Sequence, residues 1–144
     1  MTDLFSPVVL QFGGSLLAIL VLAWLTGKLG LGARPTLDSD EAVRLAAGQA
    51  EDGYEPVAIA RDRHGIAALA QDARGGIMVL RPHGGHIAAR ILRAGATARI
   101  LQDGDDIMLD VDCGERRFGT VVLAIEDANT WADAINRLSD ADHA

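Results

Sequence analysis

The chain has 144 residues, a net charge of −7 and an isoelectric point of about 4.9. Nucleic acids require a basic protein surface, so this acidic chain is not expected to bind them. Its one cysteine, Cys113, excludes an intrachain disulfide and is consistent with a reducing compartment.

The first predicted element is a membrane-spanning helix over residues 7–27, which makes 1–27 a membrane anchor. No charged residue falls between Asp3 and Lys28, and about 20 apolar residues in a helix are enough to cross a bilayer core. A cleaved signal peptide requires a positively charged start, whereas neither lysine nor arginine precedes this helix. We therefore expect an uncleaved anchor.

The flanks and one face of this helix predict its orientation and its packing. Lys28 and Arg34 follow the helix, so the positive-inside rule places the N-terminus outside and the C-terminal domain in the cytoplasm. Small and weakly polar residues share one helix face, namely Gln11, Gly14, Ser15 and Ala18. Such a face permits close packing with a membrane-protein partner or a second copy, although glycine and serine are common in membrane helices generally.

Residues 28–38 are predicted to be a juxtamembrane linker, because glycine and proline interrupt them. The soluble domain, 39–144, then begins with a short helix in "SDEAVRLAAGQ". Ser39 or Asp38 can cap its start, and Gly48 is expected to end it.

Apolar runs and turn signals alternate from residue 57, which predicts about seven short strands in a mainly antiparallel β domain. The runs are 57–60, 66–71, 76–82, 86–92, 98–102, 106–112 and 117–125. Alternation in "DIMLDVD" predicts which of its side chains face inward. Ile107, Leu109 and Val111 are expected to point in, and Met108, Asp110 and Asp112 to point out.

The last predicted element is an amphipathic helix in "EDANTWADAINRL", residues 126–138. Ala128, Trp131, Ile135 and Leu138 are spaced as one apolar stripe. Asp127 or Asn129 can cap the helix, and Arg137 is expected in its last turn. The stripe should lie across an open edge or mouth of the sheet.

Seven short strands followed by a helix with "NTWADAINRL" resemble the pleckstrin-homology-like (PH-like) fold over residues 57–139. The resemblance implies two curved sheets in a partly open barrel that the last helix plugs. It also implies a ligand end built from the loops after the first, third and sixth strands. Members bind phosphoinositides, peptides or partner proteins, and the fold itself implies no catalysis. The whole chain looks like a single-pass bacterial inner-membrane protein.

The stretch "RPHGGHIAAR", residues 81–90, is predicted to be a hairpin with Gly84 and Gly85 as the two turn residues, both at positive φ. This register pairs His83 with His86. One face is wholly apolar and is expected to be buried, namely Met78, Leu80, Pro82, Ile87, Ala89 and Ile91. The other face is expected to point outward, and it carries Ile77, Val79, Arg81, His83, His86, Ala88, Arg90 and Leu92.

Two kinds of site could use this hairpin. His83 and His86 lie close enough to share a metal ion, with His64 as the one further candidate ligand. The resemblance instead gathers basic loops at one end, namely Arg61, Arg63 and His64, then Arg81, His83 and His86, then Arg116 and Arg117. Such an end could bind anionic headgroups or an acidic partner. We expect no resident cofactor.

Catalytic motifs give little support for an enzyme. The glycines form no nucleotide-binding loop and the aspartates form no EF-hand ladder. Arg116 and Arg117 are expected to lower the pKa of Cys113, but no positioned base accompanies the thiol. The predicted function is therefore that of a non-enzymatic accessory, assembly or interaction module of a membrane complex. A headgroup or acidic-peptide sensor is the first alternative, and a histidine metal site or metal-dependent enzyme is the second.

Overall fold

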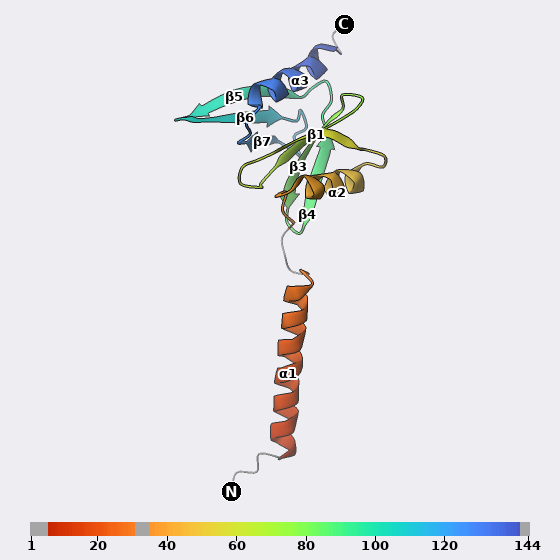
Figure 1. Ribbon diagram of the computed structural model, residues 1–144, viewed down its shortest axis with the longest axis vertical. Coiled ribbons are helices and arrows are strands. Elements are labelled where there is room, and N and C mark those ends of the chain that lie inside the picture. Colours follow the sequence, from red (N-terminus) through yellow and green to blue (C-terminus); the bar gives the residue numbers. More distant parts are fainter. Residues whose placement is uncertain (1–5, 31–34, 142–144) are drawn as a thin grey trace. The chain divides into compact units, whose positions relative to one another are not determined.

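The computed structural model describes residues 6–30 and 35–141. The chain divides into two compact units, Met1–Ala33 and Arg34–Ala144. The first unit contains one helix, α1 (Pro7–Lys28). The second contains α2 (Asp40–Ala50), seven strands and α3 (Ala128–Ala141) (Figure 1).

The predicted apolar segment forms α1, a continuous helix of 22 residues. The Ser6 side chain caps it by accepting a hydrogen bond from the Val9 N–H at 3.3 Å, and Pro7 occupies the first turn, where its missing N–H costs nothing. At about 1.5 Å per residue the helix is about 33 Å long. It is thus long and apolar enough to cross a membrane.

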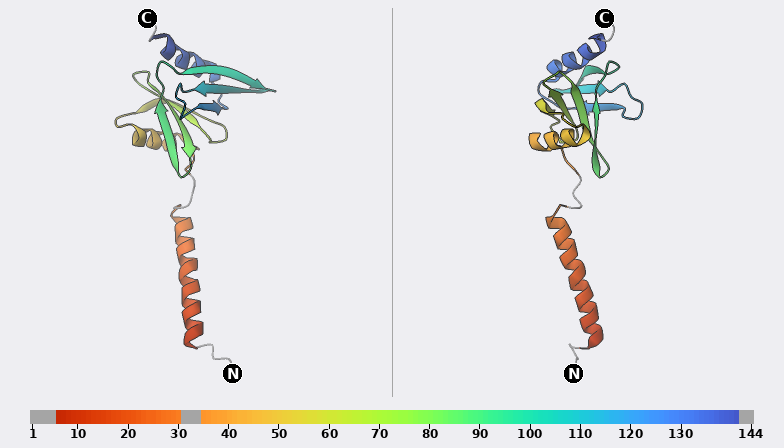
Figure 2. Two further views of the ribbon diagram at one scale, coloured as in Figure 1. Left: turned by 180° about the vertical axis from the view of Figure 1, so that it is seen from behind. Right: turned by 90° about the vertical axis from the view of Figure 1, so that its right-hand side faces the viewer.

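The predicted β domain is present as two antiparallel sheets (Figure 2). The four-stranded sheet has the order β1 (Pro56–Arg61), β2 (Ala68–Asp72), β3 (Ile77–His83) and β4 (His86–Ile91). The three-stranded sheet has the order β5 (Thr97–Asp103), β6 (Asp106–Asp112) and β7 (Thr120–Leu123). Helix α2 covers one face of the larger sheet, and α3 lies beside β5 and β6.

Both faces of the larger sheet are buried at its centre. Met78 and Leu80 of β3 point toward α2, where Val43, Leu37 and Tyr54 complete a small core. On the opposite face, residues of β2 and β3 pack against the smaller sheet, namely Leu69, Ile77 and Val79. The expectation that the face of Ile77 and Val79 points outward is therefore wrong, because that face lines the inter-sheet core.

Two boundary predictions near α2 also differ from the structure. The helix continues through Gly48 to Ala50, because the carbonyl of Ala47 still accepts from the N–H of Glu51 at 3.0 Å. Leu37, in the segment predicted to be a linker, is fully buried and belongs to the α2 core. Ser39 caps the helix as predicted, accepting from the Ala42 N–H at 3.1 Å.

Helix α3 closes one edge of the smaller sheet. Its stripe of Trp131 and Ile135 enters the inter-sheet core. The Asn136 amide accepts from the N–H of Ala98 and donates to the carbonyl of the same residue, both at 2.9 Å. One side chain thus supplies edge strand β5 with the pair of bonds that a neighbouring strand would make. Arg137 is not in the last turn as predicted, because the helix runs on to Ala141.

The β5–β6 hairpin extends past the third strand of its sheet. β7 ends at Leu123, opposite Leu109, so Ile107 lies beyond β7 and is 47% exposed instead of facing a core. Asp110 lies on the predicted outer face but is only 6% exposed. The predicted facing of the β6 side chains is therefore correct, but the exposure expected of Ile107 and Asp110 is wrong, because Ile107 lies beyond β7 and Asp110 is buried on the outer face.

Asp62 joins the loop after β1 to the segment after β7. Its Oδ1 accepts from the Ala124 N–H at 2.7 Å, and its Oδ2 accepts from the His64 N–H at 2.8 Å. The N–H of Arg63 donates to the Ala124 carbonyl at 2.9 Å. These bonds close the gap between the two sheets at this corner, and Asp62 itself is 4% exposed.

We predict that Asp62→Ala destabilises the domain by about 3 kcal/mol, because it leaves buried amides without acceptors. Urea unfolding followed by tryptophan fluorescence measures the change. Asp105→Ala serves as the control, since Asp105 is an exposed turn residue, and it should cost less than about 0.5 kcal/mol. Equal losses for the two variants would contradict the closing role of Asp62.

Tyr54 gives a second prediction, because it is the only tyrosine in the chain. Its hydroxyl shares its proton between the carbonyls of Ala70 and Gly76, both at 2.8 Å. Burial, and then the negative charge of Asp72, raise its pKa from 10.0 to about 12. Absorbance at the tyrosinate band should titrate accordingly in the folded protein.

Because the folded pKa of Tyr54 is the higher one, its stabilising contribution is complete below pH 10 and is lost as the pH rises toward 12. A titration midpoint near the ordinary value in folded protein would mean that the hydroxyl is solvated.

Candidate functional site

The His-Gly-Gly-His hairpin has the predicted register. His83 pairs with His86, Pro82 with Ile87 and Met78 with Ile91. Of the two turn glycines, Gly84 has a φ in the left-handed region, at 63°, and Gly85 does not. The prediction that both turn positions require a positive φ is therefore wrong. A positive φ at the first turn residue alone is the requirement of a type II′ turn.

The two histidine rings lie beside each other on the exposed end of this hairpin. Their centroids are 5.7 Å apart in an edge-on arrangement. Among residues 6–30 and 35–141, no three His, Cys, Asp or Glu side chains are grouped as a metal site requires. His64 is therefore not brought to the pair, and it lies exposed in the loop after β1.

The arginines at the end of β1 and in the loop after it are held by acidic residues. Arg61 Nε donates to Asp40 Oδ1 at 2.8 Å, and its Nη1 donates to the Asp38 carbonyl at 2.6 Å. Arg63 Nη1 donates to Asp106 Oδ1 at 3.2 Å. Arg61 thus faces the start of α2, and Arg63 faces the β5–β6 turn.

The β3–β4 hairpin meets the loop after β6 through an aromatic ring. The Arg81 guanidinium lies 4.6 Å from the centroid of the buried Phe118 ring, and Arg90 lies 5.8 Å from it on the same hairpin. Arg90 Nε also donates to Glu115 Oε2 at 3.3 Å. Stacking of this kind holds the loop on the hairpin.

The structure therefore brings together only part of the predicted basic end. The loop that carries the exposed Arg116 and Arg117 contacts the hairpin of Arg81. Arg61 and Arg63 make their contacts with other acidic segments. The four residues of the predicted helix-packing face on α1 are all exposed, namely Gln11, Gly14, Ser15 and Ala18.

Cys113 is buried rather than poised for reaction. Burial, and then the charge of Asp112, raise the pKa of its thiol from 9.0 to about 11, against an opposing effect of Arg81. The expectation that Arg116 and Arg117 lower this pKa is wrong, because Arg81 is the arginine that lowers it, and loss of hydration outweighs that effect. Protonated thiols are poor nucleophiles.

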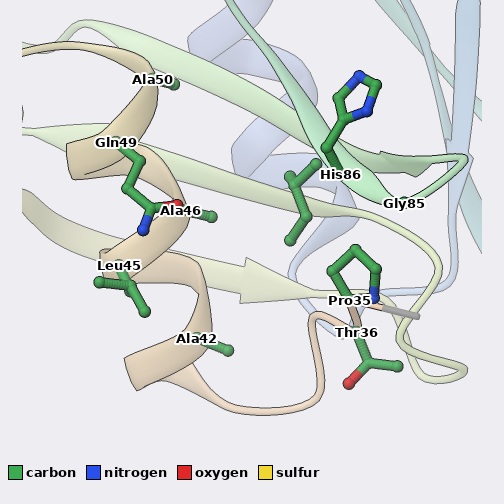
Figure 3. Close-up of a pocket in the computed structure, with 10 residues that line it drawn as sticks. Pro35, Thr36, Ala42, Leu45, Ala46, Gln49, Ala50, Gly85 and His86 are labelled. Carbon is green, nitrogen blue, oxygen red and sulfur yellow. The ribbon is translucent and has the colours of Figure 1, made fainter. Parts of the chain in front are cut away.

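A groove beside the hairpin was not predicted from the sequence. It lies between α2 and β4 and encloses about 410 Å³. Figure 3 shows Ala42, Ala46 and Ala50 of α2 pointing toward Pro35 and the hairpin, while Leu45 and Gln49 lie at the rim of the groove. A second hollow of about 180 Å³ follows beyond Ala50, where Ala89, Arg90 and Ile91 line the strand side.

The groove exists because small side chains line the exposed flank of α2. Ala42, Ala46 and Ala50 recur every four residues and so share one helix flank. β4 is an edge strand with a sheet neighbour on one side only, in the part of the chain that the structure describes. One of its carbonyls, Ala89 O, accepts from Arg90 Nη1 at 3.1 Å. The alanine spacing is visible in the sequence, but which strand would lie opposite it is not.

No protein-family model, curated protein or solved structure matches this chain.

We predict that Cys113 reacts slowly with iodoacetamide in the folded protein at pH 8, because its pKa is about 11 and its side chain is buried. In urea the reaction should be at least about tenfold faster, since a free thiol has a pKa of about 8.5. Mass spectrometry of the intact chain follows the modification. Equal rates in both conditions would show that the thiol is exposed.

Proposed function

We propose that the protein is a non-enzymatic, single-pass membrane protein whose β domain is an accessory, assembly or interaction module of a membrane complex. The observation that carries this proposal is the groove between α2 and the edge strand β4. An edge strand has backbone N–H and C=O groups free to pair with an incoming segment. The small alanine side chains leave room for such a segment.

The two units of the chain support an anchored module. α1 is long and apolar enough to cross a membrane, and Lys28 ends it. The proposed topology places the β domain in the cytoplasm and the N-terminus outside, at a bacterial inner membrane. Arg34, the second charge on which this topology rests, lies outside the described residues.

The arrangement of four strands, three strands and a final helix is the one that a PH-like domain requires. Trp131 and Ile135 of α3 lie in the core between the sheets, which is where a plugging helix would place its apolar stripe. We propose that the domain is PH-like, which favours a binding function, since members of that family act by binding.

The alternatives receive less support from the geometry. A headgroup sensor needs free cations, yet Arg61 and Arg63 are engaged by Asp40 and Asp106. Exposed ion pairs of this kind are worth at most about 1 kcal/mol, so a phosphate could compete for them. A histidine metal centre would have to rely on His83 and His86 alone, and zinc sites usually have three or four protein ligands.

We predict that crosslinking the full-length protein in mild detergent captures a partner, and that Leu45→Ser reduces the yield at least threefold. Leu45 is 64% exposed on the rim of the groove, so its loss should leave the fold intact. Val57→Ser is the matched control, because Val57 is a 65% exposed aliphatic residue on β1. A strictly monomeric protein with no crosslinked partner would refute the accessory function.

A further inference from the structure

The outer face of the three-stranded sheet has no layer packed on it in the described part of the chain. The corresponding face of the larger sheet is covered by α2. On the uncovered face, apolar side chains lie at one end and polar ones at the other. The apolar group is Leu101, Met108 and Val122, and the polar group is Thr97, Arg99, Asp110, Asp112 and Thr120.

This face carries a large part of the acidity of the protein. Residues 97–112, which form the β5–β6 hairpin, contain five aspartates and one arginine, a net charge of −4 out of −7 for the chain. Asp103, Asp105 and Asp106 lie at its turn, and Asp110 and Asp112 lie along β6. A partner that meets this hairpin must therefore be cationic to be attracted and not repelled.

Asp110 is the unusual member of this group. Its side chain is 7% exposed, and Arg99 Nε donates to its Oδ2 at 2.7 Å. The other carboxylate oxygen, Oδ1, is buried and has no hydrogen-bond partner among the described residues. Buried carboxylate oxygens are normally satisfied. An unpaired one points to a donor that the isolated chain does not supply.

The sheet is hollowed at this position. Asp110, Asp112, Thr97 and Thr120 line a space of about 350 Å³ together with Ala98 and Arg99. Thr97 and Thr120 flank Asp112 on the two neighbouring strands. The Arg99 side chain is 78% exposed and holds only one oxygen of Asp110, which leaves Oδ1 as the oxygen available to a ligand.

We propose that this face docks a basic, amphipathic segment of a partner protein, with a lysine or arginine of that segment donating to Asp110 Oδ1. This inference rests on the proposed function as an interaction module and names a second surface for it. The hollow accepts the cationic group between Asp110 and Asp112. Val122, beside Asp110, and Met108 and Leu101, nearer the β5–β6 turn, receive the apolar residues of the segment.

A side-chain cation fits the hollow better than a metal ion. Calcium takes six to eight oxygen ligands, several of them from carboxylates. Here two carboxylates face the space, one of them held by Arg99, and no group of three metal-ligating side chains exists among the described residues. An ammonium or guanidinium group needs only a few acceptors in such positions.

The test measures binding of a fluorescein-labelled hexapeptide of alternating valine and lysine to the full-length protein in detergent, by anisotropy at low salt. We expect Asp110→Asn to weaken binding at least tenfold. Asp105→Asn, which makes the same change of charge in the exposed turn, should weaken it less than twofold. Circular dichroism verifies that both variants fold.

A second pair of variants avoids any change to the buried carboxylate. Val122 lies directly opposite Asp110 on β7 and is 39% exposed. In Val122→Lys the new ammonium lies opposite Asp110 and competes with the peptide's cation for its carboxylate, so peptide binding should fall at least tenfold. Val57→Lys adds the same charge at an exposed position on β1 and should change binding less than twofold.

Four results would each overturn the proposal. Equal loss in Asp105→Asn and Asp110→Asn would show attraction to general acidity, as would equal binding of an alternating valine–glutamate peptide. Calcium binding that Asp110→Asn abolishes would assign the hollow to a metal ion. Conversion of a dimer to a monomer by Val122→Lys would assign the face to a second copy of the chain.

Failure of this inference is distinguishable from failure of the proposed function. If the basic peptide does not bind but Leu45→Ser still reduces the crosslinked partner, the docking face is wrong and the module stands. If no partner is crosslinked in detergent, the proposed function fails whatever the peptide does.

Discussion

The architecture depends on β2 and β3 having no exposed face along most of their length. Ile77 and Val79 pack against the smaller sheet, while Met78 and Leu80 pack under α2. A strand that is apolar on both sides must be covered on both sides. The segment containing Leu37 and α2 is therefore an integral layer of the fold, and the groove beside β4 lies between this layer and the sheet.

The strands and the hairpin register could be read from the sequence because they depend on local chemistry. Alternation, turn glycines and the paired runs around Gly84 determine where β3 and β4 begin and how they face each other. The orientation of the faces could not be read. Both faces of "IMVL" are apolar, and only the presence of α2 decides that the sheet has two cores.

The same limit applies to the candidate sites. Arg61 and Arg63 were predicted to belong to a basic end of the domain. The carboxylates that pair with them are distant in sequence, so these ion pairs were not predicted. The role of Asp62 was not predicted, because its bond to the Ala124 N–H depends on how the two sheets meet. Asp110 was assigned correctly to the outer face, but its burial depends on Arg99, eleven residues away.

The two proposed docking surfaces of the domain differ in their chemistry. The groove between α2 and β4 lies beside an edge strand and has small apolar walls. The hollow over β6 offers an unpaired carboxylate oxygen on an acidic sheet. Under the two proposals, the groove would bind an extended segment through its backbone and the hollow would bind by charge, so one domain would have room for two different chains.

The two hydrogen bonds between the Asn136 side chain and the Ala98 backbone have a consequence for folding during synthesis. Asn136 follows Ala98 by 38 residues. The edge of β5 therefore stays unpaired during synthesis until α3 has been made. Unpaired strand edges are the sites at which nascent chains aggregate. Loss of the part of α3 that carries Asn136 would therefore leave the β5 edge uncovered in every newly made chain, where it favours aggregation.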